Sequence, residues 1–279
     1  MRIDAHHHVW QMDRYDYAWM GPELEVLHRD YGPDDLEPNL RHHRIEHTVL
    51  VQTISSVEET RWFLELAGAY PFIAGVVGWV DLTDPEVGQT IEELRAGAKL
   101  VGIRHQVHDE PDARWLLRAE VLRGLEEVSN HGLAYDLLIR PAHLAVSLAV
   151  ARRVPDLRLI VDHIAKPAIA QRGWDDWADG IAALAACPNV ACKLSGMVTE
   201  ADWKQWTLED FGPYIAHVLE QFGPDRVMFG SDWPVCLLAG SYDQVVEMLT
   251  SHLESLSSHE RRHVFGNTAA NWYRIPLSV

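Results

Sequence analysis

Residues 133–163 read LAYDLLIRPAHLAVSLAVARRVPDLRLIVDH, and they contain the pattern on which the fold depends. Two short and largely apolar runs, 133–139 and 157–163, flank a stretch of helical periodicity at 142–153. Pro141 stands at the expected first turn of that helix, where its missing N–H is not needed. Near-continuous apolar runs are typical of parallel strands that are covered on both faces. The segment therefore predicts a strand–helix–strand unit with parallel strands.

The same unit recurs along the whole chain. Runs that predict strands lie at 2–6, 47–52, 73–80, 99–104, 133–139, 157–163, 189–195 and 226–232. Stretches that predict helices lie at 57–69, 86–96, 113–130, 142–153, 174–186, 208–222 and 241–255. An open doubly wound α/β sheet is the alternative, but no G-x-G-x-x-G follows any of these runs. Eight strands within 279 residues favour one TIM-type (β/α)8 barrel over residues 1–279.

Composition and charge narrow the classes of partner. The chain is 47% hydrophobic and carries a formal net charge of -17, so it can bury a large core and offers no excess of basic residues. Nucleic acids and anionic membrane surfaces both attract basic patches, and we expect neither as a partner. The cysteines are Cys187, Cys192 and Cys236, an odd number without C-x-x-C spacing. Together with the lack of an apolar leader, they predict a cytoplasmic protein. We expect a small-molecule substrate as its partner, and the sequence does not indicate the oligomeric state.

Two stretches between predicted elements are longer than a barrel needs. Residues 9–46 hold four aromatic side chains near their start, and residues 196–212 hold Trp203 and Trp206. Long aromatic loops that follow strands usually cover the C-terminal face of a barrel, although they can also simply pack against it. We expect both stretches to be capping loops at that face.

Catalytic groups of such barrels come from the C-terminal ends of several strands. The first strand reads IDAHHHV at 3–9, and alternation predicts that Asp4, His6 and His8 share one face while His7 points away. Later strand ends contribute Arg104, His163, Lys193, Asp232 and Trp233.

Each of these residues taken alone has an ordinary structural explanation, but the combination indicates a site. Three imidazoles, His6, His8 and His163, and the carboxylate of Asp232 are expected to converge on one mouth. Such a set can hold a divalent cation. Without a metal, the carboxylate can take a proton from water while nearby donors stabilise an oxyanion.

The motifs IDAHHHVW, VDHIAKP, KLSGM, FGSDWPV and VFGNTAANWYRI, in this order and spacing, resemble the amidohydrolase superfamily. Within it, they are similar to the branch of sugar lactonases that act on fuconolactone or rhamnonolactone, which is related to the pyrone-dicarboxylate lactonases. The resemblance implies that Asp232 is the general base and that His6, His8 and His163 are catalytic or, if a metal is bound, its ligands together with Asp232.

The resemblance also bears on cofactors. Lys193 falls where binuclear members carry a further histidine, and its charge disfavours a second metal. We therefore expect either no required cofactor or one divalent cation, zinc or manganese. We further expect Arg104, Lys193 and Trp233 to bind the substrate.

The expected function is hydrolysis of a sugar lactone, such as L-fucono- or L-rhamnonolactone, by water that Asp232 activates. The first alternative is a mononuclear metal-dependent amidohydrolase or decarboxylase with a small carboxylated substrate. The second is a barrel that only binds sugars or metals, which is less well supported because a binding protein needs no general base on its last strand.

Overall fold

The computed structural model describes residues 1–97 and 99–275, and its centre is a parallel eight-stranded sheet in the order β1 to β8. The strands are β1 (Ile3–His7), β2 (His47–Val51), β3 (Ile73–Gly78), β4 (Leu100–His105), β5 (Ala134–Leu137), β6 (Arg158–Val161), β7 (Val190–Leu194) and β8 (Val227–Phe229). The backbone N–H of Asp232 donates to the His6 carbonyl at 2.8 Å, and that of His8 to the Trp233 carbonyl at 2.7 Å. These bonds join β1 to the residues after β8 and complete a (β/α)8 barrel, which confirms the predicted fold.

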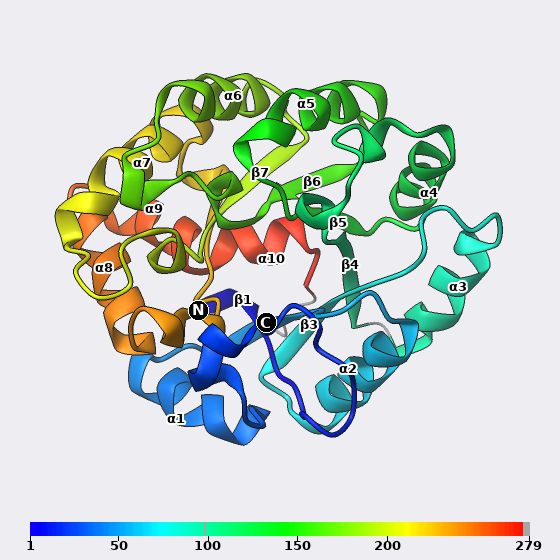
Figure 1. Ribbon diagram of the computed structural model, residues 1–279, viewed down its shortest axis with the longest axis horizontal. Coiled ribbons are helices and arrows are strands. Elements are labelled where there is room, and N and C mark those ends of the chain that lie inside the picture. Colours follow the sequence, from blue (N-terminus) through cyan, green and yellow to red (C-terminus); the bar gives the residue numbers. More distant parts are fainter. Residues whose placement is uncertain (98, 276–279) are drawn as a thin grey trace.

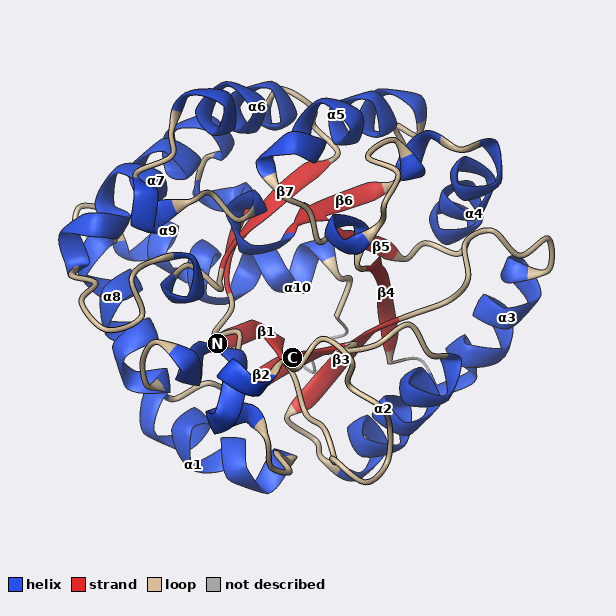
Figure 2. Ribbon diagram, viewed as in Figure 1, coloured by secondary structure: helices blue, strands red, loops and turns tan. Residues whose placement is uncertain are grey.

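Helices form a ring around the strands (Figures 1 and 2). They are α1 (Pro33–His43), α2 (Val57–Ala69), α3 (Val87–Leu94), α4 (Ala119–Asn130), α5 (Leu144–Arg153), α6 (Asp175–Ala185), α7 (Leu208–Phe222), α8 (Tyr242–His252) and α9 (Ser258–Arg262). A further helix, α10 (Thr268–Trp272), does not belong to the ring. The start of α8 shows how local sequence begins a helix. The hydroxyl of Ser241 accepts a hydrogen bond from the N–H of Gln244, and the side-chain oxygen of Gln244 accepts one from the N–H of Ser241, which together form a capping box. None of the described helices is both long and apolar enough to cross a membrane.

The structure differs from the sequence predictions in the segment between β1 and β2. Residues 33–43, which we expected to belong to a capping loop, form α1, so the loop itself ends before Pro33. Pro33 starts this helix and Pro38 lies inside it, and the internal proline weakens the helical signal in the sequence. The loop before α1 does reach the C-terminal face, because Trp19 lines the pocket there.

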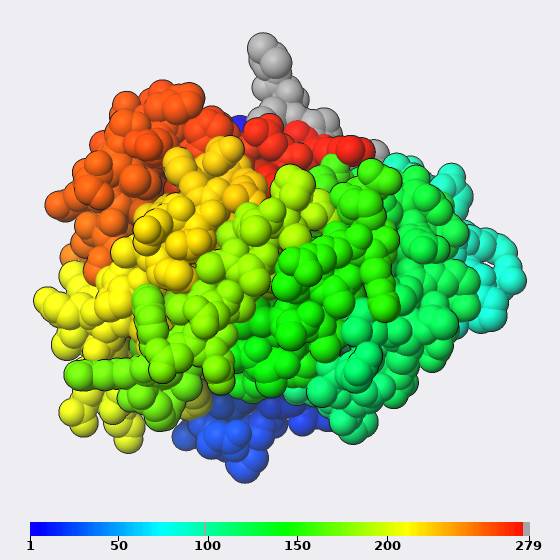
Figure 3. Space-filling view, turned by 90° about the horizontal axis from the view of Figure 1, so that it is seen from above, coloured from blue at the N-terminus to red at the C-terminus, as the bar shows by residue number. Residues whose placement is uncertain are grey.

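The opposite end of the barrel is filled with apolar side chains and closed by α10. Its interior holds one cluster of buried residues from all eight strands, together with Ala269 and Ala270 of α10 and Tyr273, which directly follows that helix. In Figure 1, α10 lies across the centre of the barrel, and in Figure 3 the red C-terminal segment and the blue early loop occupy opposite edges of the molecule. The C-terminal ends of the strands therefore lie at the end of the barrel that α10 leaves open.

Candidate active site

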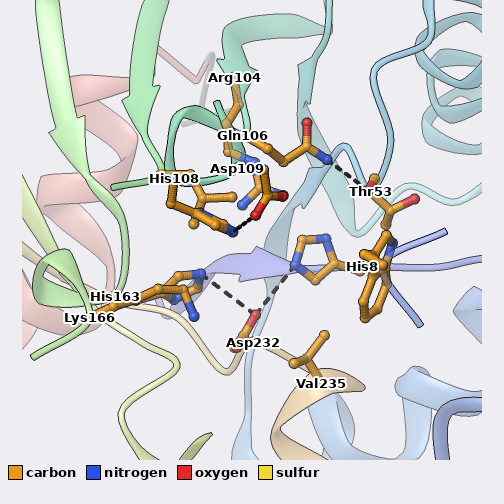
Figure 4. Close-up of a pocket in the computed structure, with 12 residues that line it drawn as sticks. His8, Thr53, Arg104, Gln106, His108, Asp109, His163, Lys166, Asp232 and Val235 are labelled. Carbon is orange, nitrogen blue, oxygen red and sulfur yellow. Dashed lines mark hydrogen bonds and ion pairs between the residues drawn. The ribbon is translucent and has the colours of Figure 1, made fainter. Parts of the chain in front are cut away.

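A cavity of about 160 Å³ lies at the C-terminal ends of the strands. Its walls are formed by His8, Trp19, Thr53, Arg104, Gln106, His108, Asp109, Leu138, His163, Lys166, Asp232 and Val235. Figure 4 shows His8 and His163 on either side of Asp232, with Arg104 and His108 across the cavity. The cavity thus combines one buried carboxylate with several nitrogen donors and a few apolar surfaces.

The first strand reaches this cavity through a β-bulge. The pairing of β1 with β2 shifts between Asp4 and His7, which places an extra residue in β1. As a result, Asp4 does not share the face of His6, contrary to the simple alternation expected from the sequence. Its carboxylate instead accepts from the hydroxyl of Tyr242 at 3.0 Å and from the N–H groups of His6 and Ser231. Asp4 therefore ties β1 to the loop that carries Asp232.

The three consecutive histidines that follow Asp4 in the sequence have different surroundings. His7 points away from the cavity, where its Nε2 lies 2.9 Å from the hydroxyl of Thr48. His8 lines the cavity, and His6 lies directly behind it, with 3.2 Å between the two Nε2 atoms. The chemistry of the triple histidine thus rests on its first and third members.

Asp232 lies at the centre of the predicted residues. Its Oδ1 is 3.3 Å from His8 Nε2, 3.7 Å from His6 Nε2 and 3.9 Å from His163 Nε2. Burial alone raises the pKa of this carboxyl, but the fields of His163 and the hydrogen bond with His8 outweigh it and leave the pKa below the ordinary value. Asp232 is therefore a carboxylate near neutral pH, able to accept a proton.

The backbone around the site is strained. Of the eight described non-glycine residues with positive φ, five lie here: Asp232 and the consecutive residues 163–166. A left-handed conformation costs a non-glycine residue about 1–2 kcal/mol, so the four-residue turn persists only because its surroundings impose it. This turn aims both His163 and Lys166 into the cavity (Figure 4). Gly196 (φ +57) allows the approach, because a Cβ there would collide with the His163 ring.

The protonation states of the imidazoles follow from their partners. His8 Nδ1 is 2.7 Å from the carbonyl oxygen of Val51, which can only accept, so Nδ1 carries the proton. Burial lowers the pKa of His163 to about 4 and holds the pKa of His6 well below its ordinary value, with Lys193 adding to the effect on His6. His6 and His163 are therefore neutral at physiological pH.

These residues fit a single divalent cation. At metal–ligand distances of about 2.0–2.2 Å, neighbouring atoms of a tetrahedral shell lie about 3.3 Å apart. The separations of 3.2 and 3.3 Å that His8 Nε2 makes with His6 and Asp232 match that spacing. The bond from His8 to Val51 is also the kind of support that metal-binding histidines use. His6, His8 and Asp232 thus form a group able to hold one ion, to which His163 can add a ligand.

A layer of buried charges lies beneath the cavity. Lys193, which has no exposed surface, is 2.6 Å from Asp136 and 2.9 Å from Asp162. Arg104 donates to Asp162 at 3.0 Å and to the side chain and carbonyl of Gln52. The hydroxyl of Tyr273 donates to Asp136 at 2.7 Å, so this layer also touches the residue that directly follows the final helix. The charges compensate one another, as buried ions must.

Two residues expected to bind substrate do not reach the cavity. Lys193 lies in the charged layer, where its ammonium is held by Asp136 and Asp162 beneath the cavity. Trp233 is 3% exposed and its ring packs against Tyr31, with centroids 5.4 Å apart. The aromatic wall is formed instead by Trp19 of the early loop. Arg104 does line the cavity, as expected.

The wall of the cavity that follows β2 and β4 was not predicted from the sequence. Thr53 and Gln106 line the cavity and are joined by a bond of 3.0 Å from the Gln106 amide to the Thr53 carbonyl (Figure 4). Buried Glu59 holds this wall by accepting from the N–H groups of Thr53 and Ile54. The position of these polar residues immediately after predicted strands was the available signal.

Comparison with known proteins agrees with this geometry. The family described as Amidohydrolase matches residues 3–275. The chain is 41% identical to an L-fucono-1,5-lactonase of Burkholderia multivorans, covering 99% of this chain and 97% of that protein. It is 40% identical to an L-fucono-1,5-lactonase of Burkholderia ambifaria, over 98% and 96% of the two chains. A crystal structure of an amidohydrolase from B. multivorans with bound zinc superimposes with a TM-score of 0.96 at 40% identity, covering 99% of this chain and all of that one.

Proposed function

The chain belongs to the amidohydrolase family, and we propose that it is a lactonase that opens the ring of a sugar lactone with a water molecule activated by Asp232. The observation that carries this proposal is a single ionised carboxylate set among three imidazoles in a small cavity. Such a carboxylate needs only a nearby water molecule and an electrophilic carbonyl to act as a general base.

The proposed reaction conserves its proton. The oxygen of water bonds to the lactone carbonyl carbon as Asp232 takes one proton from that water. The bond between this carbon and the ring oxygen then breaks, and the ring oxygen receives the proton from Asp232. The product is a single aldonic acid, which ionises to the aldonate. The reaction needs no co-reactant other than water.

Charge that develops on the carbonyl oxygen needs donors. Arg104 and Lys166 both line the cavity. The N–H groups of Arg104 are taken up by Gln52 and Asp162, so this residue contributes a fixed positive charge, and the ammonium of Lys166 is the cationic donor available to the substrate. Preorganised positive charge of this kind stabilises an oxyanion more than mobile water does. A divalent cation held by His6, His8, His163 and Asp232 would polarise the same carbonyl as a Lewis acid.

The cavity walls favour a neutral, polyhydroxylated ring over a dicarboxylate. Thr53, Gln106 and Asp109 offer polar groups that suit hydroxyls, while Trp19 and Leu138 offer apolar surface. The guanidinium of Arg104 is largely occupied by protein partners, so it is poorly placed to bind a substrate carboxylate as well. With the two similar L-fucono-1,5-lactonases, this supports L-fucono-1,5-lactone as the substrate, and L-rhamnonolactone as the stereochemical alternative.

A metal-dependent hydrolase or decarboxylase is the second candidate, and the cation-compatible group of His6, His8 and Asp232 is the observation that favours it. In either case we place the enzyme in the cytoplasm, in keeping with its three free, buried cysteines.

Acid release from a panel of aldonolactones and small carboxylated compounds, followed with a pH indicator before and after chelation, separates these candidates. We expect rapid opening of L-fucono-1,5-lactone, above its spontaneous rate. Activity that survives chelation supports Asp232 acting on water without a metal, whereas activity that is lost and returns with zinc or manganese assigns the four residues to metal binding. If no lactone is opened under either condition, the proposed function is wrong.

A further inference from the structure

Lys166 forms an ion pair with Glu200 at the rim of the cavity. The lysine ends the left-handed turn 163–166 after β6, and its ammonium donates to Glu200 Oε1 at 2.7 Å. Glu200 ends a short helical turn, Val198–Glu200, in the stretch after β7 that we expected to cap the barrel. Both side chains are 16% exposed, so water and salt screen this pair less than they screen a pair on the open surface.

The lysine of this pair lies at the boundary between two hollows. It lines the cavity of about 160 Å³ and also an adjoining hollow of about 640 Å³. The two hollows share four other lining residues, Trp19, His108, Asp109 and Val235. Of the two, Glu200 lines only the larger hollow, which also contains the exposed ring of Trp203 and therefore reaches the surface. A molecule that leaves the cavity through this hollow passes both members of the ion pair.

The proposed reaction changes the charge of the molecule in the cavity. A sugar lactone is neutral, whereas the aldonate carries a carboxylate at the carbon that water attacked. Of the Arg and Lys side chains that line the cavity, Arg104 has its N–H groups taken up by Gln52 and Asp162. The ammonium of Lys166 has three N–H groups, and its one acceptor among the described residues is Glu200. Lys166 is therefore the cation to which the new carboxylate can bind.

We propose that Glu200 is a positioning residue that weakens the binding of the aldonate product, because its carboxylate competes with that of the product for the ammonium of Lys166. The binding of the neutral lactone is affected much less, so Glu200 favours the exchange of product for substrate. Asp109 and Asp232, which line the same cavity, also repel an anion. Arg140 lines the larger hollow, but it is exposed and its charge is screened. The inference rests on the proposed function, because it requires a neutral substrate and an anionic product.

Inhibition by added product measures this effect. Glu200→Gln keeps the shape of the side chain and removes its charge. We expect it to lower the inhibition constant of the aldonate formed from L-fucono-1,5-lactone about five- to tenfold, while KM for the lactone changes less than about twofold. Glu93→Gln is the matched control, because Glu93 pairs with Arg61 at the surface and its loss changes the net charge equally. This control should leave both constants unchanged.

A cycle with Lys166→Met separates competition for the ammonium from a disturbance of the loop. Lys166→Met alone should raise the inhibition constant of the aldonate. The addition of Glu200→Gln should then cause no further change, because the ammonium for which the two carboxylates compete is gone. An effect of Glu200→Gln that persists in the Lys166→Met background, or that changes KM equally, would overturn the proposal.

The outcome for the unmodified enzyme distinguishes this inference from the proposed function. If the enzyme opens lactones and the inhibition constant of the aldonate is the same in Glu200→Gln, the inference is wrong and the proposed function stands. If the unmodified protein opens no lactone, the proposed function fails and the inference falls with it.

Discussion

At the N-terminal ends of the strands, the barrel interior is filled by residues such as Ile3, Ala134 and Met228, and α10 covers them. At the C-terminal ends, the interior carries histidines, carboxylates and cations, and five described non-glycine residues near the cavity have strained backbones. The first region is apolar, whereas the second is polar and held in place by its neighbours. Burial of apolar side chains at the closed end stabilises the fold. The strained backbone at the open end costs part of that free energy and holds the reactive groups in place.

The charged layer of Lys193, Asp136, Asp162 and Arg104 lies between these regions. It belongs to neither, because its groups are buried like the core yet charged like the site. The contact of Tyr273 with Asp136 links it to the closed end, and the contact of Lys193 with His6 links it to the open end. Mutations at the open end should mainly change turnover, and mutations at the closed end should mainly change the free energy of unfolding. Mutations in the charged layer should change both.

The largest expected effect is the loss of turnover in Asp232→Asn. An amide cannot take a proton from water, so we expect kcat for lactone opening to fall by about 10²- to 10⁴-fold, with little change in the free energy of unfolding. Steady-state kinetics and chemical denaturation measure the two quantities. Asp4→Asn is the matched control, because Asp4 also lies where β1 meets the residues after β8 but its carboxylate contacts Tyr242 instead of the cavity. This variant should mainly lower the free energy of unfolding. An Asp232→Asn enzyme with normal kcat would contradict the assignment of the base.

The link to the closed end is tested by Tyr273→Phe. Loss of the hydroxyl leaves Asp136 with one donor fewer in a buried setting, which we expect to cost about 1–3 kcal/mol of unfolding free energy. Because the change lies far from the cavity, KM should stay the same while kcat decreases modestly through Lys193 and His6. Denaturant titration with kinetics on the same preparation checks both. A change in KM without a loss of stability would contradict the claim that Tyr273 acts on stability and not on substrate binding.

The wall of the open end should give a pH-dependent stability. Burial raises the pKa of Glu59 to about 7, although the hydrogen bonds from Thr53 oppose this shift. Between the ordinary value of 4.5 and about 7, the unfolded chain ionises Glu59 while the folded protein keeps it protonated. The contribution of Glu59 to stability is therefore full below about pH 4.5 and is lost as the pH rises to about 7, by up to about 1.4 kcal/mol per pH unit.

Glu59→Gln should remove this part of the pH dependence, because an amide of the same shape does not ionise. Unfolding free energies of both proteins between pH 4.5 and 8 provide the measurement. Parallel pH profiles for the two proteins would show that Glu59 is ionised in the fold.

The smallest expected effect distinguishes strained from relaxed backbone. Ala165 has a φ of +62, within the left-handed turn that carries His163. Glycine there relieves strain that offsets its extra chain entropy, so Ala165→Gly should be close to neutral in stability. Ala183→Gly within α6, whose backbone is regular, should cost about 1 kcal/mol. Equal losses in the two variants, measured by thermal unfolding, would mean that the turn is not strained.

Much of this architecture could be predicted from the sequence. Each of the eight predicted strands overlaps an observed one, because buried parallel strands leave continuous apolar runs. His6, His8, His163 and Asp232 could be expected to converge because the C-terminal ends of barrel strands meet at one mouth. The structure brings all four together, while their chemical roles stay proposals.

Other features depend on contacts that leave no local signal. The bulge that turns Asp4 away from His6 follows from pairing with β2, and the left-handed turn at 163–166 is imposed by surrounding packing. The depth of Lys193 could not be read because a strand pattern gives the face of a residue but not its height in the barrel. Trp19, and not Trp233, forms the aromatic wall of the cavity, and this depends on how the long loop after β1 folds back over the barrel.

The most direct test of the central claim is to open L-fucono-1,5-lactone with the enzyme in water enriched in 18O and to locate the label by mass spectrometry. Attack of activated water on the carbonyl predicts one 18O atom in the carboxylate of the aldonate and none in the hydroxyl released from the ring, at a rate well above the spontaneous reaction. Label in the released hydroxyl, or no acceleration over the spontaneous rate, would contradict the account.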